Sequence, residues 1–191
     1  MRRKIISNNE ANFWNVKDDL KDKNFSEIQS IARTDSLPFA VCALNVTGDM
    51  NIGMMIRTAS LMGAERFIIY GHIRYDGRTT VGAHNWLDIV KIDARIPDSI
   101  ELNYDNFFPT MEKYDYNPIF FDTGGISIKN VDMSSICHRP CLIFGNEGVG
   151  IPPILYQNRT VITIPQRGVL RSLNVSSAAS IGMYHFSSYL S

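Results

Sequence analysis

Six short apolar runs constrain the fold of this chain more than any other feature of its 191 residues. Apolar runs of this length, bounded by turn-forming residues, are typical of strands buried on both faces of a parallel sheet. Helical patterns separate several of the runs, and this alternation predicts an α/β domain with a parallel sheet flanked by helices. The runs span residues 39–46, 66–71, 88–92, 118–122, 140–144 and 160–164, of which residues 88–92 are the least apolar because they include Asp88 and Lys91.

Several segments between and after these runs are expected to be helical. One of them ends at Gly63, and glycine is common just after the last residue of a helix. The last segment is rich in small side chains, which allow a helix to approach its neighbour closely. The expected helices are 51–63, a short one near 83–87, part of 98–114 on one side of Pro109, and 174–190.

The N-terminal residues follow a separate pattern. Apolar residues between 9 and 33 recur at spacings of three and four, which predicts one or two helices. Leu37-Pro38 then interrupts the pattern, because the residue before a proline disfavours the helical conformation. We therefore expect a helical N-terminal extension over residues 1–38 and a main domain over residues 39–191.

The composition excludes several classes of protein. With 45% hydrophobic residues the chain is too apolar to be disordered. It has no stretch of about 18 apolar residues, so no membrane span is expected. The odd number of cysteines, three, favours a reducing, cytoplasmic location. Cys137, His138 and Cys141 lack a second ligand pair at zinc spacing, so we expect no metal site.

The formal net charge is zero, but the charges are unevenly distributed. Residues 93–123 carry seven acids and two bases, whereas residues 124–191 carry five bases and two acids. A polyanion would bind the basic segments and avoid the acidic one. An ordinary solvated surface explains the same distribution equally well.

The loop after the first apolar run carries polar residues that a buried element does not need. In open α/β sheets, ligands bind at the carboxyl ends of the strands. Asn51 is expected to cap the next helix, and Arg57 lies six residues later. Either Asn51 holds the Arg57 guanidinium at the mouth of a site, or it only caps the helix while Arg57 is solvated.

The loop after residues 140–144 contains three glycines between positions 145 and 150 and a lone acid, Glu147. Glycines allow the backbone to approach a ligand closely, and backbone groups can then contact the edge of a purine. The loop is not a phosphate-binding P-loop, because no Gly-Lys-Ser/Thr follows. A plain connecting loop remains the alternative.

The loop after residues 160–164 bends at Pro165 and leads into the final helix. Ser172 and Asn174 stand at the start of that helix, and either residue can cap it. Arg167 and Arg171 lie in the same loop. This concentration of polar side chains exceeds what a helix cap needs, although capping alone remains an alternative.

Taken together, the three loops resemble the three motifs of the SpoU (TrmH-like) branch of the SPOUT methyltransferases. Those motifs read Asn…Asn-Ile-Gly…Arg-Thr-Ala…Gly, Gly-x-Glu-x-x-Gly, and Ile-Pro-Met-x-Gly-x-x-x-Ser-Leu-Asn-Val-Ser. The resemblance covers about residues 39–189, including Val81-Gly82-Ala83-His84 and Thr123-Gly124-Gly125 between the motifs. The matching motif residues are Asn45, Asn51, Ile52, Gly53, Arg57, Thr58, Ala59, Gly63, Gly145, Glu147, Gly150, Ile164, Pro165, Gly168, Ser172, Leu173, Asn174, Val175 and Ser176.

The resemblance implies a fold and an activity. The fold would be a parallel sheet whose C-terminal part forms a deep trefoil knot, and the protein would be a homodimer. The activity would be transfer of a methyl group from S-adenosylmethionine to a ribose 2′-hydroxyl in RNA. Transfer RNA is favoured over ribosomal RNA as the substrate, because compact members of the family without an added domain often act on transfer RNA.

The resemblance also implies roles for individual residues. Arginine is a poor general base, because its pKa exceeds about 12. Arg57 would instead stabilise the developing alkoxide or hold the adjacent phosphate. Asn51 would hold Arg57, while Ser172 and Asn174 would shape the pocket around it. The cofactor would be held by Thr123, Gly145, Ile164 and Leu173, and the substrate by Glu147, Arg167 and Arg171. Glu147 could also position groups of the dimer partner.

Two positions depart from the family pattern. Gln166 replaces the usual methionine, which would alter the apolar wall near the cofactor, and Arg171 precedes Ser172 where smaller or acidic residues are common. Without an added RNA-binding domain, RNA would bind across the dimer surface. Tyr75 and Trp86 could stack on a base or pack in the core. Candidate phosphate contacts are Arg2, Arg3, Lys4, Arg74, Arg78, Arg167 and Arg171.

Three other functions remain as alternatives. The chain could methylate ribosomal RNA, or it could be a non-catalytic RNA-binding homodimer of the same fold. The presence of Asn51, Arg57, Ser172 and Asn174 argues against a non-catalytic protein. A methyltransferase acting on a base nitrogen belongs to another SPOUT branch, whose motifs differ from these.

Overall fold

The structure is a computed structural model that describes residues 15–99, 101–136 and 138–191. Some residues named in the sequence analysis lie outside these ranges. They are Arg2, Arg3 and Lys4 among the candidate phosphate contacts, Cys137 of the rejected metal group, and residues 9–14 of the expected N-terminal helices.

The core of the protein is a six-stranded sheet in which every pair of neighbouring strands is parallel. All six apolar runs form strands, so the prediction of a parallel α/β sheet is confirmed. The strand order is β3-β2-β1-β5-β4-β6. Strands β2 and β3 thus lie on one side of β1, and strands β4, β5 and β6 lie on its other side. The strands are β1 (Leu37–Leu44), β2 (Ala64–Tyr70), β3 (Asp88–Ile92), β4 (Asn117–Ser127), β5 (Pro140–Phe144) and β6 (Val161–Thr163).

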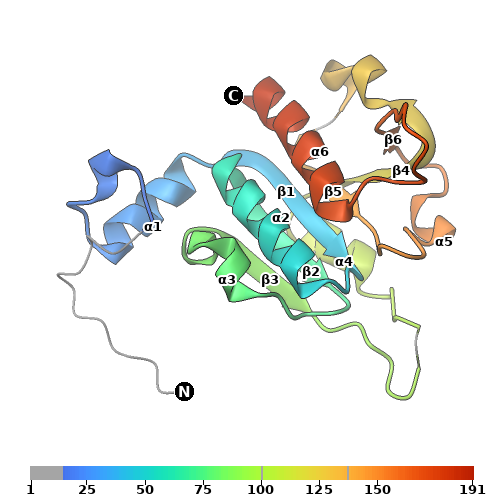
Figure 1. Ribbon diagram of the computed structural model, residues 1–191, viewed down its shortest axis with the longest axis horizontal. Coiled ribbons are helices and arrows are strands. Elements are labelled where there is room, and N and C mark those ends of the chain that lie inside the picture. The colour runs from blue at the N-terminus through green and yellow to red at the C-terminus, as the bar shows by residue number, and fades with distance from the viewer. Residues whose placement is uncertain (1–14, 100, 137) are drawn as a thin grey trace.

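Helices cover both faces of this sheet. Helices α2 and α6 lie side by side on one face (Figure 1), and a contact between the hydroxyls of Thr58 and Ser180 joins them. Helices α4 and α5 pack on the other face. The helices are α1 (Phe25–Thr34), α2 (Asp49–Leu61), α3 (Gly77–Thr80), α4 (Phe107–Lys113), α5 (Pro153–Tyr156) and α6 (Val175–Leu190). The 3-10 helices are η2 (Asp18–Leu20), η3 (Ala83–Asn85), η4 (Ile128–Asn130) and η5 (Met133–Ser135).

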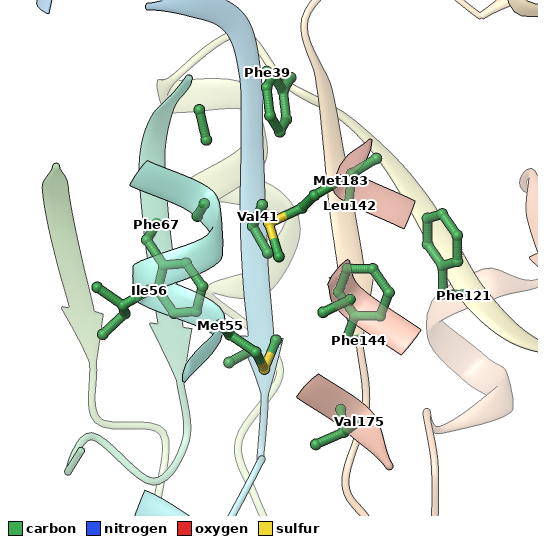
Figure 2. Packing of buried hydrophobic residues seen from close by; sticks show 14 of the residues in the cluster. Phe39, Val41, Met55, Ile56, Phe67, Phe121, Leu142, Phe144, Val175 and Met183 are labelled. Carbon is green, nitrogen blue, oxygen red and sulfur yellow. The ribbon is translucent and has the colours of Figure 1, made fainter. Parts of the chain in front are cut away.

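Alternate residues of β1 point into two separate apolar cores, as the pleat of a strand requires. Val41 packs with Met55 of α2 and Met183 of α6 on one face, as Figure 2 shows. Cys42 packs in the other core, which α4 and α5 cover. Because β1 is buried on both faces, the loop that follows it is fixed to a rigid element.

Two helix starts bear on the site. Helix α2 begins at Asp49 with Gly48 as its N-cap, so Asn51 lies in the first turn and the prediction that Asn51 caps the helix was wrong. The expected cap of the last helix is confirmed at Asn174, whose side chain accepts hydrogen bonds from the backbone N–H of Ser176 and Ser177. Asn51 therefore has its side chain free for contacts outside its own helix.

Helix α4 includes Pro109, whereas the sequence placed the helix on one side of that proline. Pro109 is the third residue of α4. The first four N–H groups of a helix have no partner within it, so the missing N–H of a proline costs little there. A proline in a first turn is thus compatible with the helix.

Strand β4 is interrupted where it faces the site. Both Phe121 and Ile126 pair with Ile162 of β6, so residues 122–125 bulge out of the ladder between them. Gly124 has a positive φ of 80°, which favours glycine. A side chain at Gly125 would place its Cβ only 2.3 Å from the carbonyl oxygen of Val161. Two consecutive glycines thus allow the bulge to form.

Helix α1 lies at the margin of the α/β unit (Figure 1). Asn24 caps it, and Asn24 and Glu27 form a reciprocal capping box. The helix is attached to the rest of the chain partly by the Gln29 side chain, which donates to the carbonyl of Asn85 over 3.4 Å. No helix among the described residues is both long enough and apolar enough to cross a membrane.

The contact of α6 with the sheet depends on Gly182. A Cβ at this position would lie 2.9 Å from Phe121 and 3.0 Å from Phe144. We predict that Gly182→Val lowers the free energy of unfolding by about 1–3 kcal/mol through overpacking, as measured by urea denaturation. Gly77→Ala is the control, because no atom lies within 4 Å of the added Cβ. Equal stability of the two variants would contradict this account of the packing.

Candidate active site

Three loops that are far apart in the sequence are joined by side-chain hydrogen bonds at the carboxyl edge of the sheet. The amide nitrogen of Asn51 donates to Glu147 Oε1 over 2.9 Å. The amide nitrogen of Asn174 donates to Asn51 Oδ1 over 3.1 Å. These two bonds connect the loops after β1, β5 and β6, which carry the three sequence motifs. The predicted convergence of the motifs is therefore observed.

Glu147 is the acceptor on which this network converges. Its Oε2 accepts from the backbone N–H of Thr47 over 3.1 Å and from the Thr47 hydroxyl over 3.3 Å. Its Oε1 accepts from the N–H of Gly48 over 3.1 Å, in addition to Asn51. Burial alone would raise the pKa of Glu147, but the hydrogen bonds from Asn51, Thr47 and Gly48 outweigh it and hold that pKa below its ordinary value.

The neighbouring residue, Asn146, fastens the glycine-rich loop. Its side-chain nitrogen donates to the carbonyl of Asn45 over 2.9 Å. Its side-chain oxygen accepts from the N–H groups of Gly148 and Val149. A Cβ at Gly145 would lie only 2.6 Å from the carbonyl of Gly150, so the loop closes on itself only with a glycine there. The loop is a fixed structure rather than a plain connection.

Beside this network lies a cavity of about 550 Å³ formed by the loops after β4, β5 and β6. This volume is in the range of pockets for small organic ligands. All four predicted cofactor residues and several other predicted site residues line it. These are Thr123, Gly145, Ile164 and Leu173 of the cofactor set, and Glu147, Arg171, Ser172 and Asn174 of the remainder.

The cavity combines an apolar wall with backbone and polar groups. Phe121, Phe144 and Ile162 contribute apolar surface at the ends of β4, β5 and β6. Asp122 contributes a carboxylate, and its Oδ1 accepts from the N–H of Thr123 over 2.7 Å. Such a combination suits a ligand with a flat apolar part and hydroxyl or amine donors.

Asp122 lines the cavity but is not among the predicted site residues, although it is an acid at the end of a predicted apolar run. The position of Asp122 depends on the bulge at residues 122–125, and no periodicity of apolar residues in the sequence predicts this bulge. A polar residue that directly follows a buried strand is the signal that could have identified it.

Arg57 lies apart from this cavity. It is exposed on α2, and no hydrogen bond or ion pair holds it within the described part of the chain. Asn51 does not hold Arg57 as the sequence analysis expected, because its two side-chain atoms are used by Glu147 and Asn174. Six residues along an α-helix turn the side chain by about 120° from its starting direction, so the two residues project from different sides.

Arg167 does not line the cavity, whereas the other predicted arginine of its loop, Arg171, does. The described residues contain no group of three or more His, Cys, Asp or Glu side chains placed to hold a metal ion.

The fold and the cavity define a class: a parallel α/β protein with a ligand cavity built from three loops at the carboxyl ends of its strands. A comparison with protein families identifies the family to which this chain belongs. A family model described as the SpoU rRNA Methylase family matches residues 38–184. The chain belongs to this family.

Two curated relatives are similar over most of this chain. The tRNA (guanosine(18)-2′-O)-methyltransferase of Aquifex aeolicus is 24% identical over 169 residues, which are 85% of this chain and 75% of the relative. An uncharacterized tRNA/rRNA methyltransferase of Archaeoglobus fulgidus is 27% identical over 149 residues, 75% of this chain and 61% of the relative.

Solved structures share the fold at low sequence identity. The A. aeolicus TrmH/SpoU tRNA-modifying enzyme has a TM-score of 0.67 at 22% identity, and the match covers 86% of this chain and 81% of the enzyme. The SpoU methyltransferase AviRb from Streptomyces viridochromogenes, in complex with AdoMet, has a TM-score of 0.65 at 23% identity. That match covers 81% of this chain and 58% of AviRb, so this chain spans less than two thirds of that relative.

The Glu147 network predicts a pH-dependent contribution to stability. We expect Glu147→Gln to lower the free energy of unfolding by about 1 kcal/mol at pH 7, because an amide cannot accept at both positions and solvent screens the partly exposed carboxylate. The pKa of Glu147 is lower in the folded protein than in the unfolded chain. The carboxylate therefore contributes its full stabilisation at pH values above the pKa of the unfolded chain. This stabilisation is lost as the pH falls through the pKa of the folded protein. The difference between variant and wild type should therefore shrink in acid, as urea denaturation at several pH values would measure.

The matched control is Glu112→Gln. Glu112 is exposed on α4, and no side-chain bond to it is found among the described residues. We expect this control to stay within about 0.5 kcal/mol of wild type. If Glu147→Gln were as stable as the control at pH 7, the network would not hold the loops together.

Proposed function

We propose that this protein is an S-adenosylmethionine-dependent methyltransferase that modifies ribose 2′-hydroxyls of RNA, with transfer RNA as the favoured substrate. One observation carries the proposal. In a chain of the SpoU family, the bonds from Asn174 to Asn51 and from Asn51 to Glu147 draw the three motif loops together beside a cavity of about 550 Å³.

The groups around the cavity fit the cofactor. The apolar wall of Phe121 and Phe144 suits an adenine ring, and the carboxylate of Asp122 can accept hydrogen bonds from ribose hydroxyls. The residues that would hold it are Thr123, Gly145, Ile164 and Leu173, as the sequence resemblance implies. When bound, S-adenosylmethionine supplies an electrophilic methyl group on a sulfonium.

Arg57 is the residue we assign to the substrate. An exposed guanidinium with no partner among the described residues is available to an incoming anion. A permanently charged group cannot take the proton of the 2′-hydroxyl. Arg57 therefore stabilises the developing negative charge on the ribose oxygen or binds the adjacent phosphate. Ser172 lies at the cavity and shapes the approach to it, and Arg167 and Arg171 add phosphate contacts from the same loop.

Glu147 and Asn51 position the site rather than contact the reacting groups. Both are engaged with each other and with the loop after β1. The family resemblance implies that Glu147 contacts the substrate and that Asn51 holds Arg57. In the proposed enzyme they instead fix the start of α2, the helix that carries Arg57.

Transfer RNA is favoured because the Aquifex relative, a tRNA methyltransferase by name, matches 85% of this chain. A neighbouring structure, described as giving insight into 2′-hydroxyl methylation of C/U34 on tRNA, covers 76% of this chain at a TM-score of 0.61. Ribosomal RNA is the alternative, and it is supported by the rRNA methyltransferase from Sinorhizobium meliloti, with a TM-score of 0.64.

A homodimer is part of the proposal. Helices α2 and α6 lie side by side (Figure 1). Both helices also expose large apolar side chains to solvent. Exposed apolar side chains gathered on one face mark protein interfaces. A second copy of the chain is the partner that the family resemblance implies. The exposed residues are Met50, Met54 and Leu61 of α2 and Ile181, Tyr184 and Tyr189 of α6.

The remaining parts of the proposal concern architecture and location. We infer that residues 1–38 form the extension and residues 39–191 the methyltransferase domain, and the family match beginning at residue 38 supports this boundary. We also infer the trefoil knot of the family in the C-terminal part. The cytoplasmic location rests on the cysteine usage and on an RNA substrate.

The activity is tested with transfer RNA from cells that lack this protein. The purified protein and S-adenosylmethionine with a labelled methyl group should label the RNA. The labelled linkage should resist alkali, because alkaline cleavage needs a free 2′-hydroxyl as the nucleophile. Labelling of ribosomal RNA alone would favour the alternative substrate, and failure to label either RNA would refute the proposed function.

Removal of the Arg57 guanidinium is expected to abolish most activity. We predict that Arg57→Ala lowers kcat/KM for methyl transfer by about 100-fold or more, as loss of a transition-state donor does. Cofactor affinity, measured by calorimetry, should change only a few fold, because Arg57 does not line the cavity. Arg33→Ala on α1 is the control and should keep wild-type activity. Unchanged turnover of Arg57→Ala would remove this residue from the mechanism.

The dimer is tested by placing a charge on its proposed interface. We predict that Tyr184→Glu shifts the molecular mass in solution from that of a dimer to that of a monomer, since a buried unpaired carboxylate is costly. Light scattering after size exclusion measures this mass. Ile154→Glu is the control, because Ile154 is as exposed as Tyr184, 66% in both cases, but lies on α5 at the other face. A wild-type protein that is monomeric would contradict the interface.

A further inference from the structure

A second cavity, of about 540 Å³, opens at the carboxyl edge of the sheet on the other side of the loop after β1. It lies between the ends of β1 and β2 and the segment that follows β3. No residue of the proposed cofactor set lines it. Its lining consists of Asn45, Thr47, His72, Asp93, Arg95, Ile96, Pro97, Ser99, Glu101 and Leu102.

The floor of this cavity is held by the core of the protein. Leu102 packs so closely on Gly71 that a Cβ there would lie 2.6 Å from the Leu102 side chain, and Gly71 has a φ of 103°. An antiparallel bridge pairs Arg95 with Leu102 and closes the base of the segment. The hydroxyl of Tyr70, which is fully buried, donates to the carbonyl of Asn103 over 2.8 Å. These contacts attach the base of the cavity, at Arg95 and Leu102, to the core.

The two cavities share one wall. Thr47 lines the second cavity while its N–H donates to Glu147, which lines the first. Asn45 also lines the second cavity, and its carbonyl accepts from Asn146 in the glycine-rich loop. A ligand in the second cavity would thus lie against the same loop that carries the first motif.

The charged side chains that line the second cavity, Asp93 and Glu101 against Arg95, leave one net negative charge. The carboxylate of Asp93 is engaged by Arg95, whose Nε donates over 2.7 Å, and His72 is held by Asp49 over 2.9 Å. Glu101 adds a further carboxylate that has no hydrogen bond or ion pair to its side chain within the described ranges. The excess of negative charge disfavours the backbone of RNA, whereas a neutral base carries no such penalty.

The free carboxylate and the apolar surface together select one kind of base. Ile96, Pro97 and Leu102 offer an apolar surface on which a planar ring can lie. A carboxylate accepts hydrogen bonds only, and guanine is the base that presents two adjacent N–H donors, from N1 and the exocyclic amine, on one edge. Unpaired bases of RNA are recognised in this way by their Watson–Crick edges.

We propose that this second cavity binds a guanine of the RNA substrate that is turned out of its stack, with Glu101 as the acceptor. The proposal rests on the RNA methyltransferase function proposed above. It assigns an acidic segment, which RNA would otherwise avoid, to the recognition of a base. The enzyme would hold its substrate at two places on opposite sides of the loop after β1.

The test uses the full-length protein and three RNA trinucleotides, 5′-UGU-3′, 5′-UIU-3′ and 5′-UAU-3′, where I is inosine and lacks the exocyclic amine. The methyl signals of Ile96 and Leu102 are followed by nuclear magnetic resonance during each titration. UGU should bind more tightly than UIU or UAU by roughly five- to hundredfold, the range of a good base contact. The Glu101→Gln variant should reduce this preference to less than about twofold, as loss of the carboxylate acceptor requires.

Glu112→Gln is again the control and should retain the wild-type preference for UGU. Equal binding of the three trinucleotides, binding that Glu101→Gln leaves unchanged, or absence of any shift at Ile96 and Leu102 would each overturn the proposal. Because no methyl donor is present, the result is independent of the proposed activity. Methyl transfer to RNA without guanine binding would keep the function and remove the base pocket. Guanine binding without methyl transfer would keep the base pocket and refute the proposed function.

Discussion

The carboxylate of Glu147 is the constraint on which the arrangement of the site depends. It receives the side chain of Asn51 and the backbone of Thr47 and Gly48, so it fixes the loop after β1 against the loop after β5. Asn174 extends the same set of bonds to the start of α6. The sheet brings three strand ends to one edge, and this network holds their loops in register there.

Most of the fold was predictable because central strands such as β1 and β5 are buried on both faces and read as nearly continuous apolar runs. Asn174 as a helix cap was predictable from its place at the start of the last helix. The position of Asn51 was not, because α2 begins two residues earlier at Asp49 with Gly48 as its cap. A local rule identified a good capping residue, but a contact with Glu147, 96 positions away in the sequence, determined what that residue does.

The rest of the site was less accessible to sequence reasoning. Asp122 reaches the first cavity through a bulge that leaves Phe121 and Ile126 paired with the same residue, Ile162. The second cavity is lined by residues scattered from Asn45 to Leu102, and no spacing connects them. Such sites arise from strand order and loop packing, whereas the motifs could be identified because each lies within one short stretch.

Asn174 serves two partners with the two ends of one amide. Its oxygen caps α6, and its nitrogen donates to Asn51. Spontaneous deamidation to aspartate would preserve the oxygen and replace the nitrogen by a second acceptor facing an acceptor. The helix would survive such chemical ageing, while the link between the last loop and the first would be lost. An aged molecule of this kind would remain folded, with the loops after β1 and β5 still joined and the loop after β6 detached from them.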